Sequence, residues 1–334
     1  MTKEVDKTQL HKKLHESMLL IRMVEEAIAE RYSEWEMRCP THLSIGQEGV
    51  AAAAGLALEN DDKVVSTHRA HAHYLGKGGD LKAMISEIYG KETGCSGGYG
   101  GSMHLIDRSK GFVGSTALVG GSIPVGVGLG LAIAQQGLPN VSGIFLGDGA
   151  VEEGVFYESA NFAALKKLPV LFICENNLYS VYSSLDVRQP EGRKIYEMVS
   201  ALGLQTAKGD GNNIMESFEM IHDARKKILA GEGPIFLEFD TYRWREHCGP
   251  NYDNDIGYRT EDEFNTWKEK DPILHSENVL KTQHGVSSAW FDEKAKEITA
   301  SIDDAFEFAK KAPFPQPESI YSKIFKPKET RSHG

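Results

Sequence analysis

The feature that constrains this chain most is a pair of polar stretches, each directly after a short apolar run. Ile144–Leu146 leads into Gly147-Asp148-Gly149, and Val170–Cys174 leads into Glu175-Asn176-Asn177. Between them apolar side chains recur at helical spacing, which predicts a strand–helix–strand unit with the helix starting near Ala150. Such a crossover joins parallel strands, so both polar stretches reach the carboxyl edge of one sheet, where open α/β sheets bind ligands.

The polar stretches offer the ligands that a hard cation prefers. Asp148 provides a carboxylate, Asn177 an amide oxygen, and the loop after Asn177 a backbone carbonyl. Oxygen ligands without thiolate or imidazole suit Mg²⁺ or Ca²⁺ better than Zn²⁺, and Mg²⁺ usually completes its shell with phosphate oxygens and water. The glycines allow close backbone approach, and the free N–H groups of the helix start favour an anion. The pattern therefore predicts a magnesium–diphosphate site.

A Gly-Asp-Gly triplet alone is weak evidence, because it also fits an ordinary turn between strand and helix. Gly209-Asp210-Gly211 is a second copy, with no compact apolar strand before it, and the strand after it (Ile235–Phe239) ends without asparagine. We interpret it as a turn before a helix starting near Met215. The first triplet differs because 26 residues separate it from Asn176-Asn177. That pairing resembles the thiamine diphosphate motif.

The composition is that of an ordinary globular protein without nucleic-acid features. Among 334 residues, 37 basic and 48 acidic side chains give a net charge of −11, which argues against a nucleic-acid partner. The four cysteines are widely spaced, as expected for reduced thiols in the cytoplasm. The N-terminal stretch has neither the apolar core of a signal peptide nor the character of a transit peptide.

One stretch is long enough to raise the question of a membrane span. Gly114–Gly137 contains no charged residue, but small residues dominate it and Pro124 lies near its middle. Few large apolar side chains are present, so a small-residue helix packed between other elements fits better than a membrane helix. We expect no membrane association.

The remaining pattern predicts one α/β domain with added helices. The predicted divisions are an N-terminal helical arm (1–34), a diphosphate-binding α/β domain with a parallel sheet flanked by helices (35–312), and a C-terminal tail (313–334). Helices are expected over residues 8–33, 49–58, 80–89, 215–229 and 291–310, and further strands over 63–67 and 235–243. Residues 245–259 form a long polar loop, which usually indicates function or mobility.

The histidines after the strand at residues 63–67 allow a zinc alternative. His68, His71 and His73 are close in sequence, but no fourth ligand accompanies them and Arg69 lies among them. The glycine-rich stretch Gly94–His104 lacks the P-loop pattern, and no dinucleotide fingerprint is present.

With these motifs together, the chain resembles the alpha subunit of thiamine diphosphate-dependent 2-oxo acid dehydrogenases, the E1 component, of the pyruvate, branched-chain and acetoin types. The resemblance runs from about residue 12 to about residue 325. It rests on the stretches HLSIGQEGV, STHRAHAHYL, GGYGGSMHL, LVGGSIPVG, LGDGA, ICENNLY and TYRWREHCGP.

The resemblance implies a role for each residue that matches the family motifs. The metal ligands would be Asp148, Asn177 and the carbonyl of Tyr179. The cofactor-binding residues would be Arg69, His68, Ala117, Val119, Gly147, Gly149, Ala150, Val181 and His247. His42 and His247 would be the catalytic acid–base groups, and His68 stands where pyruvate-type chains often have tyrosine.

The same resemblance implies an oxidoreductase that needs thiamine diphosphate and Mg²⁺, decarboxylates a 2-oxo acid or cleaves acetoin, and passes the acyl group to a lipoyl E2 partner. A beta subunit in an α₂β₂ assembly would supply the activating glutamate. Departures at Arg245-Glu246 and Cys248, in a loop that borders substrate, leave a thiamine diphosphate-dependent carboligase open. A magnesium-dependent phosphotransferase and a non-catalytic partner subunit are further alternatives.

Overall fold

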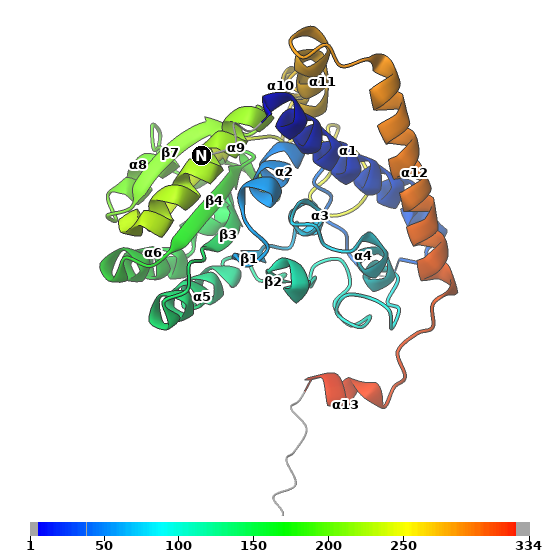
Figure 1. The fold of residues 1–334 in the computed structure, drawn as a ribbon, viewed down its shortest axis with the longest axis horizontal. Coiled ribbons are helices and arrows are strands. Elements are labelled where there is room, and N and C mark those ends of the chain that lie inside the picture. Colours follow the sequence, from blue (N-terminus) through cyan, green and yellow to red (C-terminus); the bar gives the residue numbers. More distant parts are fainter. Residues whose placement is uncertain (1–5, 38, 325–334) are drawn as a thin grey trace, which may run out of the picture.

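A single parallel sheet forms the centre of the molecule (Figure 1). The computed structural model describes residues 6–37 and 39–324. The sheet has six strands in the order β2-β1-β3-β4-β8-β7. They are β1 (Lys63–Ser66), β2 (Phe112–Ser115), β3 (Ser142–Gly147), β4 (Val170–Asn176), β7 (Gln205–Asp210) and β8 (Ile235–Asp240). All neighbours pair in parallel, which confirms the predicted α/β class with a parallel sheet.

The strand order creates a crevice at one point of the sheet. The chain passes from β1 to β2 on one side, and then returns to place β3 on the other side of β1. Ligands of open α/β sheets bind where the strand order reverses in this way. The residues that follow β1 and β3 therefore meet at the carboxyl edge.

Helices cover both faces of the sheet because side chains along each strand alternate between them. On β4, Leu171 and Ile173 join the larger core, whereas Phe172 and Cys174 join a second core on the opposite face. The larger core contains residues of α1 (Lys7–Arg31), α2 (Glu48–Ala57), α4 (Leu81–Ile88), α9 (Ile214–Lys227) and α12 (Ser288–Lys311). The second core contains residues of α5 (Ser122–Gln136), α6 (Gly154–Lys166) and α8 (Ile195–Ser200).

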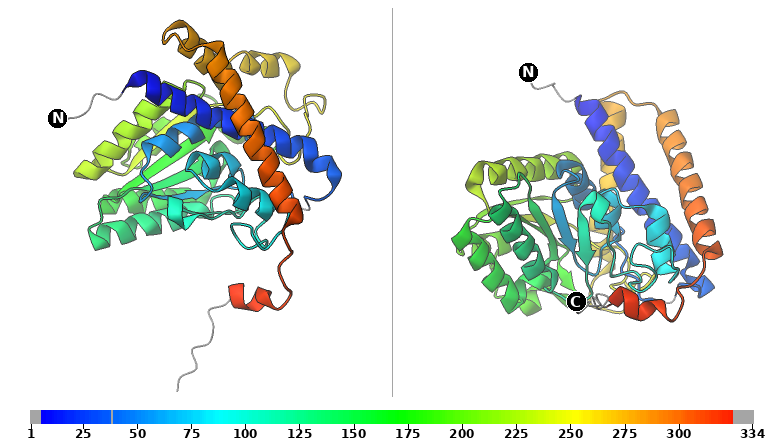
Figure 2. Two further views of the ribbon diagram at one scale, coloured as in Figure 1. Left: turned by 45° about the vertical axis from the view of Figure 1, so that its right-hand side comes forward. Right: turned by 60° about the horizontal axis from the view of Figure 1, so that its bottom comes forward.

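Shorter elements complete the chain, and two long helices lie outside the sheet. The shorter elements are α3 (His71–Gly76), β5 (Tyr179–Ser180), β6 (Ser183–Ser184), α7 (Leu185–Arg188), α10 (Glu261–Lys268), α11 (Pro272–Thr282) and α13 (Ser319–Ile324). Figure 2 shows α12 running along the outside of the molecule, close to α1 and α4. Residues 1–5 and 325–334 of the predicted arm and tail lie outside the described part, and the predicted domain bounds stay a prediction.

The helix after β3 begins later than the sequence suggested. Asp148–Glu152 form a 3₁₀ turn, and the α-helix starts at Gly154 because Glu153 has extended backbone angles (φ −72°, ψ 136°). The prediction of a helix start near Ala150 was therefore wrong. The backbone groups that follow Asp148 belong to a tight turn, whose hydrogen bonds reach only three residues along the chain.

The second Gly-Asp-Gly triplet precedes a helix, as predicted. Contrary to the prediction, a strand comes before it. Gly209 and Asp210 are the last residues of β7, and α9 begins at Ile214. β7 is an edge strand with several exposed positions, so it carries no apolar run in the sequence. None of the three residues lines the central cavity.

The uncharged stretch Gly114–Gly137 contains the last two residues of the short strand β2 and the 15-residue helix α5. Small residues let α5 pack closely on the sheet: a Cβ on Gly126 would stand 2.4 Å from the side chain of Ile144. Within the part of the chain that the structure describes, no helix has both the length and the apolar character needed to span a membrane.

The glycine-rich loop at residues 94–104 is folded around a buried carboxylate. Glu87 of α4 is fully buried, and its oxygens accept backbone N–H bonds from Ser96 (2.7 Å), Gly98 (2.9 Å), Gly100 (2.6 Å) and Gly101 (3.2 Å). Converging backbone amides of this kind satisfy a buried charge. The glycines therefore have a structural role in binding the Glu87 carboxylate, and Met103 of the same loop lines the cavity described below.

Two buried histidines on α1 predict that the fold loses stability in mild acid. Burial is the main cause that lowers the pKa of His11 and of His15 to about 4, and both rings bond the hydroxyl of Ser276. An unfolded histidine titrates near 6.5, so below that pH the unfolded chain binds more protons. Stability therefore falls as the pH drops from 6.5 towards 4.

Each of these histidines should contribute roughly 1–2 kcal/mol to that loss at pH 5. We expect thermal melts to show a Tm at pH 5 lower by about 5 °C or more than at pH 7. His15→Gln should reduce this pH dependence more than a substitution of His222, whose side chain is 40% exposed. An unchanged pH dependence in His15→Gln would contradict the assignment.

Candidate active site

All the residues predicted for the site line one cavity at the crevice between β1 and β3. Its walls contain His42, His68, Arg69, Ala117, Val119, Gly147, Asp148, Gly149, Ala150, Asn177, Tyr179, Val181 and His247. They come from separate segments that meet at the carboxyl edge of the sheet. The cavity has an end rich in oxygen ligands and an end rich in positive charge and imidazole.

At the oxygen-rich end, Asp148 lies at the end of β3 and is only 2% exposed. Burial raises the pKa of its carboxyl group, and the guanidinium of Arg188, which donates to Oδ2, opposes that rise. A buried carboxylate of this kind needs a cationic partner. In this structure the partner is a side chain that the sequence did not single out.

Asn177 is held in a fixed orientation beside Asp148. Its Nδ2 donates to Oε1 of Gln47 (3.1 Å), and its Oδ1 accepts from the backbone N–H of Tyr179 (3.2 Å). The amide oxygen therefore faces the loop whose carbonyl was the third predicted ligand. Gln47 stands at the N-terminus of α2 and lines the cavity, so it orients a predicted metal ligand.

The backbone around Asp148 and Asn177 is closely packed at two positions, Gly149 and Val181. A Cβ on Gly149 would come within 2.7 Å of the Ser180 hydroxyl, so only glycine leaves this approach open. Val181 has a left-handed backbone (φ 56°), which costs a β-branched residue about 1–3 kcal/mol. Its carbonyl accepts from Nη2 of Arg243 (3.2 Å), which holds this turn at the rim of the cavity.

At the other end, Arg69 ties together two loops. Its Nη1 donates to the carbonyl of Leu43 (2.6 Å) and its Nη2 to the carbonyl of His247 (3.1 Å). Arg69 is 6% exposed, and burial together with Arg243 lowers its pKa to about 9, so it is charged at neutral pH. The arginine thus fixes the segments that carry His42 and His247.

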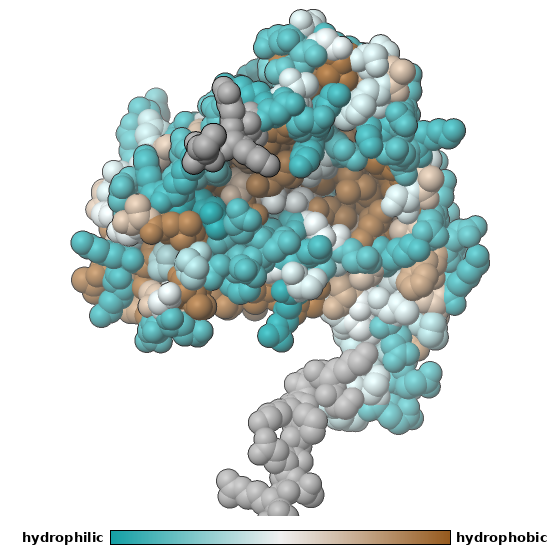
Figure 3. All heavy atoms as spheres, viewed as in Figure 1, coloured by the Kyte–Doolittle hydropathy of each residue, from teal (hydrophilic) through white to brown (hydrophobic). Residues whose placement is uncertain are grey.

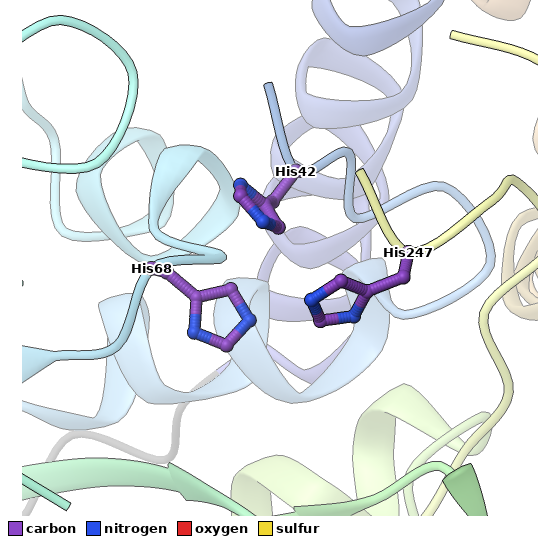
Figure 4. Close-up of side chains that lie close together, drawn as sticks. All are labelled: His42, His68 and His247. Carbon is purple, nitrogen blue, oxygen red and sulfur yellow. The ribbon is translucent and has the colours of Figure 1, made fainter. Parts of the chain in front are cut away.

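Three imidazoles from different segments face one another beside Arg69 (Figure 4). The ring centroids are 4.6 Å apart for His42 and His68, 5.0 Å for His42 and His247, and 5.3 Å for His68 and His247. Burial is the largest cause that lowers their pKa values, and Arg69 is the next. The pKa is about 2 for His42, about 4 for His68 and about 3 for His247. All three are neutral at pH 7.

This cluster has the spacing of a metal site but the electrostatics of an anion site. One ligand atom from each ring lies within 4.8 Å of the others, and Nδ1 of His42 is buried without a hydrogen-bond partner among the described residues. The adjacent Arg69 charge, however, disfavours a divalent cation for the same reason that it lowers the histidine pKa values. The end formed by Arg69 and the three rings is therefore suited to an anionic group.

The zinc alternative built on His68, His71 and His73 is not supported. His71 is fully buried between Glu25 (2.9 Å) and Ser102 (2.8 Å), and His73 bonds Ser66 and Glu175. Both rings therefore satisfy structural networks, and only His68 of the three lines the cavity. His71 and His73 lie two residues apart in α3, so their side chains do not share one face of the helix.

The loop after β8 is held by buried contacts of its own. Arg259 donates to the carbonyls of Arg243 (2.6 Å) and Trp244 (2.9 Å) and pairs with Asp253. Arg245 forms an ion pair with Glu26 of α1 and stacks on Tyr252. Within the loop, the backbone N–H of Asn251 donates to the carboxylate of Glu246, and the backbone N–H of Glu246 donates to the carbonyl of Asn251. Neither Arg245 nor Glu246 lines the cavity, which His247 alone reaches from this loop.

Apolar side chains surround the mouth of the cavity. Exposed fractions reach 73% for Leu118 and 53% for Val119, and Val181 and Tyr182 are also exposed. Further exposed apolar residues lie on α5 and α6, and Figure 3 shows hydrophobic patches along the edge where these helices lie. Large exposed apolar areas usually mark a surface that another protein covers.

Several residues of the cavity were not predicted from the sequence. They are Gln47, Thr67, Met103, Gly120, Glu175 and Ser180, together with Arg188, which bonds Asp148. Glu175 precedes Asn176 and pairs with His73 through Oε2 (3.0 Å). Its place at the end of β4 is the one signal in the sequence that pointed to it.

Fold and cavity together define an α/β protein with a cavity at the strand-order reversal, with oxygen-bearing side chains at one end and a buried arginine at the other. The family model described as "Dehydrogenase E1 component" matches residues 16–318. The chain therefore belongs to the dehydrogenase E1 component family, as the sequence predicted, and has the role of an alpha subunit of a 2-oxo acid dehydrogenase. The family implies thiamine diphosphate as cofactor and a beta subunit as partner.

Individual relatives from this family are similar to this chain over nearly its whole length. The pyruvate dehydrogenase E1 component subunit alpha of Rickettsia bellii is 35% identical over 313 residues, covering 94% of this chain and 95% of the relative. The Zymomonas mobilis subunit of the same name is 35% identical over 309 residues, covering 92% and 86%. The chloroplastic alpha-3 subunit of Arabidopsis thaliana is 33% identical over 318 residues, covering 93% and 73%.

Proposed function

We propose that this chain is the alpha subunit of a thiamine diphosphate- and magnesium-dependent enzyme that decarboxylates a pyruvate-like 2-oxo acid and passes the acyl group to a lipoyl E2 partner. The observation that carries the proposal is the single cavity in which the oxygen ligands after β3 and β4 meet Arg69 and three neutral histidines. The relatives named for pyruvate support the substrate class.

The residues present fit magnesium and a diphosphate. Asp148, the amide oxygen of Asn177 and the carbonyl of Tyr179 would hold the metal, because hard cations prefer oxygen ligands. Backbone N–H groups at Gly149 and Ala150 and the guanidinium of Arg69 would hold the diphosphate. Gly149 supports this assignment, since a side chain there would close the approach.

The chain's own chemical groups would position the substrate and move protons. Thiamine diphosphate, when bound, supplies the nucleophilic carbon and the electron sink for loss of CO₂. His42 and His247 are neutral at pH 7, so each ring can both accept and donate a proton. General acid–base groups of this kind contribute about 10²–10⁴-fold to the rate.

A beta subunit would complete the site in an α₂β₂ assembly. The apolar rim around Leu118 and Val119 supports this arrangement, because a partner that covers it would also exclude water from the cavity. The activating glutamate is assigned to that partner. The location in the cytoplasm stays a prediction.

The partner requirement predicts that the chain alone is almost inactive. We expect its turnover of any 2-oxo acid to rise by at least about a hundredfold when the beta subunit is added, since the missing glutamate is an acid–base group. The measurement is steady-state activity during titration with the beta chain. Full activity of the alpha chain alone would show that the site is already complete.

The experiment that tests the function uses the chain co-purified with its beta partner, thiamine diphosphate and Mg²⁺. A panel of 2-oxo acids and acetoin is offered, with a dye as electron acceptor in place of lipoate. We expect saturable dye reduction that requires the cofactor and is fastest with a pyruvate-like acid. Cofactor binding without dye reduction by any substrate would instead favour a carboligase.

The carboligase alternative has lost its main support. It rested on Arg245, Glu246 and Cys248. The first two side chains make contacts within the loop and with α1, Cys248 is exposed, and none of the three lines the cavity. The phosphotransferase and the non-catalytic subunit leave the joint placement of Asp148, Asn177 and Arg69 unexplained. One candidate function therefore remains.

A further inference from the structure

Asp148, at the oxygen-rich end of the cavity, has a cationic partner that belongs to the protein itself. Arg188, the last residue of α7, pairs through Nη2 with Oδ2 of Asp148, and its side chain is only 11% exposed. Asp148 is the first of the proposed metal ligands, so an arginine charge lies where a metal charge would be needed. The two partners come from loops 40 residues apart in the chain.

Arg188 is held in this position by two further contacts. Its Nε donates to the carbonyl of Ser183 (3.0 Å), and its Nη1 donates to Oε1 of Glu152 (2.5 Å). Glu152 also accepts a hydrogen bond from Gln189 (2.9 Å), so it holds the segment through two neighbouring residues, Arg188 and Gln189. The segment follows the tight turn at Val181, which directs α7 back towards β3.

A metal ion and the guanidinium compete for the same carboxylate. The carboxylate of Asp148 is almost fully buried, and a second positive charge within a few ångströms would be repelled strongly at low local dielectric. The would-be Cβ of Gly149 is 3.7 Å from Nη1 of Arg188, so the guanidinium also stands close to the backbone proposed for the diphosphate.

We propose that Arg188 is an internal counter-ion of Asp148 and sets the metal affinity of this site, because a metal ion must displace it from the carboxylate. This inference rests on the proposed function for the identity of the metal ligands. A metal ion that binds Asp148 must break the ion pair with Arg188. The free energy of that pair therefore weakens metal binding by the same amount. Arg188 is a positioning residue in this scheme, and Glu152 holds it in place.

A simpler electrostatic explanation makes a different prediction for one variant. If Arg188 acted only through its distant positive charge, Arg188→Gln would strengthen metal binding, and Glu152→Gln, which removes a negative charge, would weaken it. If Glu152 instead anchors the competing arginine, Glu152→Gln releases Arg188 and strengthens metal binding. The two explanations therefore give opposite signs for Glu152→Gln.

The test is a titration of the full-length protein, in the assembly in which it purifies, with Mn²⁺ as a spectroscopic substitute for Mg²⁺. Free Mn²⁺ is measured by electron paramagnetic resonance, first without and then with thiamine diphosphate. We expect Arg188→Gln to bind Mn²⁺ about tenfold or more tightly than the parent, and Glu152→Gln about threefold more tightly. Arg188→Lys, which keeps the charge but loses the forked contact, should lie between the parent and Arg188→Gln.

Arg193→Gln is the matched control, because Arg193 lies in the same segment and is exposed. It should leave Mn²⁺ affinity unchanged. Unchanged or weaker Mn²⁺ binding in Arg188→Gln, or weaker binding in Glu152→Gln, would overturn the proposal. If Arg188→Gln does not fold, Arg188→Lys and Glu152→Gln still decide between the outcomes.

The same titration separates this inference from the proposed function. If the variants bind Mn²⁺ more tightly but no protein binds thiamine diphosphate, the counter-ion role stands and the cofactor assignment fails. If thiamine diphosphate binds with Mn²⁺ and the variants have the affinity of the parent, the cofactor assignment stands and the role of Arg188 is refuted.

Discussion

Asp148→Asn is expected to reduce kcat/KM by at least about a thousandfold, because it removes the one charged ligand proposed for the metal. Asparagine has nearly the same shape and keeps a carbonyl oxygen, so the loss would come from charge rather than from packing. The measurement combines dye-linked turnover with Mn²⁺ and thiamine diphosphate binding, and all three should be lost together.

The chain contains its own control for this substitution. Asp210 belongs to the second Gly-Asp-Gly triplet, lies exposed at the end of β7 and accepts a local bond from Asn212 (2.9 Å). Asp210→Asn should leave turnover and metal binding unchanged. If Asp148→Asn kept normal activity, or if both variants lost activity equally, the metal assignment at the end of β3 would be wrong.

The contrast between the two triplets explains why the core of the site could be predicted. Strand and helix periodicity placed Asp148 and Asn177 at neighbouring parallel strand ends, and that geometry follows from topology alone. Asp210 was set aside because the sequence shows no apolar strand before it; the structure has the edge strand β7 there, but it places Asp210 away from the cavity. Position in the sheet therefore carried more information than the triplet itself.

Residues that reach the site from irregular segments could not be predicted in this way. Arg188 meets Asp148 because a turn at Val181 adopts a left-handed backbone, and valine gives no signal for such a conformation. Gln47 looked like an ordinary residue before an alanine-rich helix, yet it orients Asn177. Their roles depend on tertiary contacts that sequence spacing does not encode.

The helix boundary after β3 was missed for a related reason. Residues 148–152 form a 3₁₀ turn, and the extended backbone of Glu153 delays the start of the α-helix to Gly154. The glycine-rich loop was noted without a role, because its reason is the buried carboxylate of Glu87 on a preceding helix. In both places the structure depends on a neighbouring residue, Glu153 or Glu87, rather than on the local sequence pattern.

Substitution of Arg69 should have the second large effect, and two variants can separate its charge from its geometry. Arg69→Gln removes the charge and the fork, whereas Arg69→Lys keeps the charge but cannot hold the carbonyls of Leu43 and His247 together. We expect both to weaken thiamine diphosphate binding by about a hundredfold, since charge-assisted contacts to a diphosphate are lost or misplaced. Calorimetric titration with cofactor and Mg²⁺ measures this effect.

The histidine pKa values distinguish the two variants. Burial is the main cause that lowers the pKa of His42, His68 and His247, and the Arg69 charge is the next, so Arg69→Gln should raise all three part of the way towards 6.5, whereas Arg69→Lys should leave them low. Protonation in Arg69→Gln would then begin at a higher pH, and the acidic limb of the pH–activity profile would move upwards. Histidine resonances followed by NMR measure the same shift without turnover. If both variants kept parent pKa values, burial alone would account for the neutral histidines, and Arg69 would act only as a link between the two loops.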